Sequence, residues 1–245
     1  MVKVGRAVRH IMLISALLAA VATLVACVPE QEPALDFLVA TEGAAYDGVT
    51  VSEERIEELR ADIERYREEI RETTVRLGRV ATFQRLLARE LMEAEMYGPA
   101  LEALEAAMEI QTDNANLYYL AGVATARSAR ARAIAGDEAA YYERAERLYR
   151  AAIDIRPDYR EALYGLTVLL TFELDRPEEA LSYARRLAEV ESREPSVQFL
   201  FANVLVRNGL DEEAAAVYGE LARNALTDEQ RRRAAHNRDA LTENR

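Results

Sequence analysis

The stretch FANVLVRNGLDEEAAAVYGEL, residues 201–221, decides the fold. Apolar residues recur at spacings of three and four on both sides of Asn208-Gly209, which indicates two helices joined by a short turn. Small residues, Ala202 and Ala214, stand where two such helices would touch closely. The stretch therefore predicts a helical hairpin.

The composition of the whole chain favours helix nearly throughout. Gly and Pro are few, and Ala, Glu, Leu and Arg dominate. These four residue types are good helix formers or are tolerated well in helices. Half of the 245 residues are hydrophobic, so the chain can bury a core.

Similar hairpins return along the chain at a period near 34 residues; Gly122, for example, falls 34 residues after Ala88. The pattern of small and large positions resembles the tetratricopeptide repeat (TPR) family, which implies an all-α solenoid of about four helical hairpins. The third hairpin fits the pattern less well, because about three extra residues lie in its turn, near 173–177. The predicted repeats cover residues 81–114, 115–159, 160–194 and 195–228.

The second repeat carries an insertion between its two halves. Gly122 and Ala145 are 23 residues apart, where the TPR pattern has 12. We expect two lengthened helices that project beyond the edge of the solenoid. This edge is either a partner-binding surface or a solvated basic edge that pairs with nearby acids. Its candidate residues are Arg127, Arg130, Arg132, Tyr141 and Tyr142.

A long helix is predicted over 52–80, before the repeats, with Thr50 and Glu53 as a capping box or Ser52 as the N-cap. Its apolar residues form a stripe typical of a and d heptad positions. The helix either covers the first repeat as an N-terminal cap or pairs with a second copy of the chain as a coiled coil. A C-terminal capping helix is predicted over 229–245.

The N-terminus has a basic start followed by a nearly continuous apolar run over 11–26, the layout of a secretory signal. Leu24-Val25-Ala26-Cys27 resembles the lipobox of bacterial lipoproteins. That resemblance implies cleavage of a signal peptide, 1–26, and acylation of Cys27. An ordinary signal peptide or an uncleaved anchor is the alternative. Val28 follows the cysteine, and the absence of Asp there resembles the outer-membrane default.

Residues 27–51 hold two prolines, two glycines and several acids without a helical period. They are expected to form a tether between the lipid and the folded body. The alternative is an extended segment that packs on the body through Leu35, Phe37 and Leu38.

The charge and the missing motifs exclude several functions. The net charge is −12; loss of the three basic residues of the signal brings it to −15. We therefore expect no non-specific binding of nucleic acid. The sequence contains no phosphate loop, GxSxG or GxGxxG motif. One histidine outside the signal and no free cysteine cannot build a metal site. No cofactor, metal or catalytic residue is predicted.

The first helix of each repeat lines the concave face in TPR proteins. The resemblance carries groove positions onto a mixture of aromatic, amide and arginine side chains, which suits a peptide or helix with apolar and acidic features. It does not match TPR proteins that clamp a carboxylate, because Arg85 and Arg89 replace their Lys and Asn. Each residue could instead serve packing or face solvent. The positions are Arg85, Arg89, Met92, Asn116, Tyr119, Val123, Phe199, Asn203 and Arg207.

Together these features predict a non-catalytic, lipid-anchored scaffold that faces the periplasm and holds a protein or peptide partner of the cell envelope. The chain resembles TPR lipoproteins of spirochaetes, some of which are linked to periplasmic transport systems. One alternative is an outer-membrane assembly lipoprotein. Another is a carrier whose groove encloses a small hydrophobic ligand in a deep cavity lined by Tyr119, Val123 and Phe199.

Overall fold

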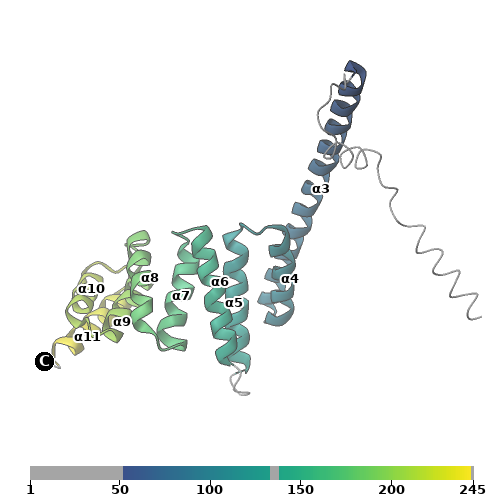
Figure 1. Cartoon of the computed structure of the whole chain (residues 1–245). Coiled ribbons are helices and arrows are strands. Elements are labelled where there is room, and N and C mark those ends of the chain that lie inside the picture. The colour runs from purple at the N-terminus through teal and green to yellow at the C-terminus, as the bar shows by residue number, and fades with distance from the viewer. Residues whose placement is uncertain (1–51, 133–137, 244–245) are drawn as a thin grey trace, which may run out of the picture. The chain divides into compact units, whose positions relative to one another are not determined.

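A computed structural model describes residues 52–132 and 138–243 of the chain. Within these ranges every regular element is a helix (Figure 1). The elements are α3 (Glu53–Glu93), α4 (Tyr97–Ile110), α5 (Ala115–Arg132), α6 (Glu138–Ile155), α7 (Arg160–Val168), the π-helical turn η2 (Leu169–Glu173), α8 (Pro177–Val190), α9 (Pro195–Arg207), α10 (Asp211–Asn224) and α11 (Asp228–Glu243).

The chain divides into two units, residues 1–64 and 65–245, and the array of hairpins lies in the second. There, helices that follow one another in the chain pack side by side (Figure 1). Ala81 and Ala88, near the end of α3, share an apolar cluster with α4. Further along, α5 packs on α6, α7 on α8 and α9 on α10, and α11 packs on α10. The predicted all-α solenoid is therefore confirmed.

Close approach of the helices in the second and third repeats depends on two glycines. The ring of Tyr149, which is buried on α6, lies against the backbones of Gly122 on α5 and Gly165 on α7. A Cβ atom at Gly122 would stand 2.7 Å from Cε1 of Tyr149, and one at Gly165 would stand 2.9 Å from the same atom. Both distances are shorter than van der Waals contact, so only glycine fits at either position.

The N-terminal helix differs from the prediction. Instead of a helix that ends at residue 80, α3 continues without a break into the first helix of the first repeat, to Glu93. The one helix-breaking residue in this region is Gly78. A single glycine costs a helix only about 1 kcal/mol, which is too little to end one that is stabilised on both sides. At the start of α3, the backbone N–H of Arg55 donates to Oγ of Ser52, so Ser52 acts as a cap.

The extra residues of the third repeat are accommodated in the helix as well as in the turn. After Val168 the helix widens into the π-helical turn η2, in which the N–H of Leu174 donates to the carbonyl of Leu169. Asp175 follows with a φ of 51°, in the left-handed region. This wider turn brings Glu173 back toward α5 and α6, where it takes part in the site described below.

The predicted signal peptide, Cys27 and the tether lie outside the described residues. None of the helices in 52–132 and 138–243 combines the length and apolar character needed to cross a membrane.

The packing of Tyr149 predicts opposite outcomes for two glycine-to-alanine changes. Gly122→Ala should force the buried ring to move, whereas Gly78→Ala adds a Cβ with nothing within 4 Å. Both gain the same helix propensity, so their free energies of unfolding should differ by about 1–3 kcal/mol, the usual cost of overpacking. Urea denaturation followed by circular dichroism measures this difference; equal stabilities would contradict the packing described.

Candidate functional site

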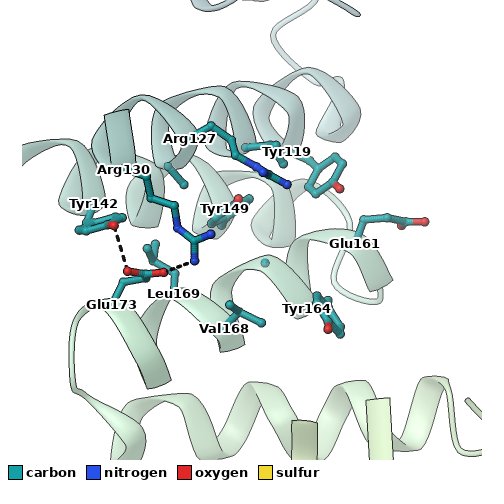
Figure 2. Close-up of a pocket in the computed structure, with 13 residues that line it drawn as sticks. Tyr119, Arg127, Arg130, Tyr142, Tyr149, Glu161, Tyr164, Val168, Leu169 and Glu173 are labelled. Atoms are coloured by element: carbon teal, nitrogen blue, oxygen red, sulfur yellow. Dashed lines mark hydrogen bonds and ion pairs between the residues drawn. The ribbon is translucent and has the colours of Figure 1, made fainter. Parts of the chain in front are cut away.

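A pocket of about 270 Å³ opens between α5, α6 and α7 (Figure 2). Tyr149 forms its inner wall, and Tyr119 and Tyr164 stand at one end. Val123, Val168 and Leu169 supply apolar surface between the charged and aromatic groups. The pocket exists because the Tyr149 ring, held between two glycines, sets the separation of α5 and α7.

The end of this pocket away from Tyr119 and Tyr164 is closed by a charged cluster from three elements. Arg130 on α5 donates to Oε1 of Glu173 at 2.5 Å, and the hydroxyl of Tyr142 on α6 donates to Oε2 at 2.9 Å. Figure 2 shows both contacts as dashed lines. The hydrogen bond from Arg130 holds the pKa of Glu173 below its ordinary value, despite partial burial. The positive charge of Arg130 is therefore largely neutralised within the cluster.

Arg127, one turn earlier on α5, differs from Arg130 in its charge environment. Its side chain is exposed and extends along the pocket toward Tyr119 (Figure 2). The second carboxylate that lines the pocket, Glu161, pairs with Arg160 at 2.9 Å. Within the part of the chain that the structure describes, no carboxylate lies within ion-pair distance of Arg127. The pocket thus presents one uncompensated guanidinium beside tyrosine rings.

A second pocket, of about 440 Å³, continues from the first and lies among α7, α9 and α11. The two pockets share Tyr164 and Val168, and we call them together the groove. The second pocket also holds a guanidinium, because Arg233 of α11 lies 4.9 Å above the ring of Phe199. Among the described residues Arg233, like Arg127, has no carboxylate partner. The groove therefore has a cation in each half and apolar surface between them.

Tyr119 and Tyr149, two tyrosines of the groove, stay protonated at neutral pH. Burial raises the pKa of both Tyr119 and Tyr149 above the ordinary value of a phenol. The Tyr119 ring packs at 5.5 Å from that of Tyr159, edge to face. These rings therefore offer rigid apolar surface and a neutral hydroxyl rather than a titrating group.

The structure separates the nine predicted groove residues into two groups. Tyr119 and Val123 line the first pocket, and Phe199 and Asn203 line the second. The other five line neither: Arg85, Arg89, Met92, Asn116 and Arg207. Two of these five are engaged within the fold, since Asn116 donates to the hydroxyl of Tyr159 and Arg207 pairs with Asp175. Because Phe199 lies apart from Tyr119 and Val123, no single cavity of the kind expected for a small-ligand carrier contains all three.

Three of the five predicted insertion residues lie at the groove. Arg127, Arg130 and Tyr142 all line the first pocket. Tyr141 instead contributes to a pocket beside α4. Arg132 is the last residue of α5, and its side chain lies outside what the structure describes.

Several residues of the site were not among the sequence candidates, including Tyr164, Glu173 and Arg233. No groove position was assigned in the third repeat, which fits the repeat pattern less well than the others. Arg233 lies on the capping helix, outside any repeat, and nothing in its local sequence distinguishes it from the adjacent Arg231 and Arg232.

The two carboxylates that line the first pocket, Glu161 and Glu173, are both engaged in ion pairs. Among the described residues, no cluster of three or more His, Cys, Asp or Glu side chains could hold a metal ion. Both carboxylates of the first pocket, Glu161 and Glu173, have a lowered pKa. Glu173 is held ionised by Arg130 and Tyr142, which disfavours a role in proton transfer at neutral pH.

Arg130 and Arg127 make a matched pair for testing the cluster. Because the folded-state pKa of Glu173 is lowered, the stability that its ion pair contributes is present above about pH 4.5 and is lost as the pH falls through the folded pKa. Arg130→Gln should therefore lower the free energy of unfolding by about 1 kcal/mol at pH 7. Its deficit relative to wild type should shrink below about pH 4.

Arg127→Gln removes the same charge from the same helix and should show no such pH-dependent deficit. Urea titrations at a series of pH values measure both variants. Identical pH profiles for the two variants would show that the cluster contributes nothing to stability.

Comparison with known proteins agrees with this architecture. No family model matches the sequence. A TPR repeat-containing protein of Borreliella burgdorferi is 25% identical over 182 residues, which cover 74% of this chain and 78% of that protein.

Among solved structures, YrrB, described as a TPR protein with an unusual peptide-binding site, superposes with a TM-score of 0.53 at 22% identity, over 66% of this chain and 77% of YrrB. TTC0263, a thermophilic TPR protein of Thermus thermophilus, superposes with a TM-score of 0.52 at 20% identity, over 63% of this chain and 79% of TTC0263. The chain therefore shares the fold of these TPR structures, in which helices that follow one another in the chain pack side by side.

Proposed function

We propose that the protein is a non-catalytic scaffold, anchored by lipid to a bacterial membrane, which holds a segment of another envelope protein in the groove. The observation that carries this proposal is the pair of uncompensated guanidiniums, Arg127 and Arg233, on either side of the Tyr164–Val168 surface. A chain of net charge −12 presents basic groups there, although acids outnumber basic residues elsewhere.

The chemistry of the groove defines the segment it fits. Each guanidinium can take a carboxylate through paired hydrogen bonds. The tyrosine and valine side chains between them offer an apolar surface with few rotatable bonds, which favours an apolar or aromatic side chain. We therefore expect an acidic segment with an apolar residue between two carboxylates. YrrB, whose fold is shared, is described as having a peptide-binding site, which supports the choice of a peptide ligand.

The lipid anchor rests on the lipobox at Leu24 to Cys27. Acylation would place the groove at the periplasmic face of a membrane, most simply the outer one, because no Asp follows the cysteine. Two or three acyl chains, at about 0.8 kcal/mol per buried CH₂, give stable attachment. A role as an accessory of a periplasmic transport system, which the spirochaetal resemblance implies, is the setting that we propose.

Capture in the native envelope tests the groove. A photoreactive phenylalanine analogue replaces Tyr164, which is 39% exposed and lines both pockets. The matched probe replaces Ile155, which is 38% exposed on α6 and lines neither. We expect one envelope protein to be captured from position 164 and not from position 155, with the adduct mapping by mass spectrometry to an acidic segment.

Charge variants then test the recognition itself. Arg127→Gln and Arg233→Gln should each lower the yield of that adduct about tenfold, because each removes a charge-assisted contact. Arg147→Gln, which removes a charge from the exposed surface of α6, should leave the yield unchanged. Equal yields from all three variants would mean that the guanidiniums do not recognise the partner.

Acylation is tested separately. Cells labelled with a fatty acid analogue should transfer the label to the wild-type chain and not to Cys27→Ser. A label that persists in Cys27→Ser would contradict the anchor.

A further inference from the structure

Helix α3 exposes a stripe of large apolar side chains that the other residues described by the structure leave uncovered. Of the 41 residues in α3, only Ala81 and Ala88 are buried, both of them in the core cluster that includes α4. Five large side chains between 70 and 87 are 47–70% exposed: Ile70, Leu77, Val80, Phe83 and Leu87. They occupy a, d and g positions of the heptad pattern and so share one side of the helix. A contiguous apolar strip of this kind marks an interaction surface.

The charges of α3 indicate what covers the strip. Residues 53–69 hold eight acids and four arginines, whereas residues 70–89 hold five arginines and one acid. One half of the helix is thus acidic and the other is basic. A second α3 running in the opposite direction would place each acidic half beside a basic half. Parallel pairing would instead bring like halves together.

The heptad positions allow a small set of registers for such a pair, which differ in the charges that they bring together. With a twofold axis between residues 71 and 72, Ile70 faces Thr73 of the partner subunit and Tyr66 faces Leu77 of the partner subunit. At the edge of the same interface, Glu69 lies beside Arg76 of the partner subunit, and the twofold axis repeats each contact. The register with its axis at residue 68 is disfavoured, because it sets Glu69 close to a second acidic stretch, including Glu68 of the partner subunit.

We propose that the protein self-associates through α3, as an antiparallel helix pair in this register. The interface is isologous, so a single surface suffices for a closed dimer. It uses the side of α3 that α4 leaves free, and it shares no residue with the groove. The dimer and the groove can therefore succeed or fail independently.

Cross-linking of the full chain in native membranes tests the proposal. Two differently tagged copies are co-expressed, with a photoreactive phenylalanine analogue at Leu77 in one of them. The matched probe replaces Val75, which is similarly exposed, at 51%, but lies on the opposite side of the helix. We expect an adduct carrying both tags from position 77, linked to the partner near residue 66, and none from position 75.

A charge exchange separates this register from other modes of pairing. Glu69→Arg and Arg76→Glu each set like charges together twice in the dimer and should each weaken association about tenfold. The double variant, with both changes, restores the opposite charges and should recover the adduct. Helical circular dichroism of each variant verifies that α3 still forms.

Four outcomes would overturn the proposal. They are an adduct from Leu77 with residues 28–51 of the same chain, an adduct with an unrelated protein alone, linkage near residue 77 of the second copy, and failure of the double variant to recover. None of them bears on capture at Tyr164, so loss of the dimer and loss of the groove are distinguishable.

Discussion

Tyr149 fills a space that exists only because Gly122 and Gly165 carry no side chain. The ring is packed against two backbones at once, so it fixes the distance between the first helices of neighbouring repeats. Everything in the first pocket follows from that distance: the width between α5 and α7, the inner wall, and the position of Arg127 relative to Tyr164. The Tyr149 ring thus fills space in the core and also determines the shape of the first pocket at the surface.

The arginines of the site fall into two groups: those that form ion pairs within the fold and those that can pair with a ligand. Arg130 is engaged by Glu173, and one turn after Tyr142 on α6 the buried Glu146 pairs with Arg150 and Arg176. Such pairs connect neighbouring repeats, as in the contact of Arg130 on α5 with Glu173 after α7. Arg127 and Arg233, which have no carboxylate partner among the described residues, define the charge of the ligand that the groove can recognise. An acidic chain can therefore carry a locally basic groove, because local pairing rather than net charge sets the field at contact distance.

Much of the fold was predictable because each repeat shows a similar spacing of small and large apolar residues. The spacing of Ala202, Ala214 and Tyr218 encodes a hairpin directly, and four such hairpins in register leave little ambiguity. The continuity of α3 was missed because a change in role at residue 80 requires no break in the backbone. The groove was predicted in part: Tyr119 and Val123 follow the period, whereas Tyr164 belongs to the third repeat, to which no groove position was assigned because it fits the pattern less well. Arg233 came from the capping helix, where no period applies.

The packing of each helix mainly on its sequence neighbours has a mechanical consequence. In such an array, small rotations at successive contacts add up, so the body is stiff across its width and compliant along its length. A ligand that touched α5, α7 and α11 together would act as a brace across several of these contacts. Binding would restrict these rotations, and the lost conformational entropy would reduce the free energy of binding. The affinity of such a ligand would therefore depend on the flexibility of the whole array as well as on its contacts in the groove.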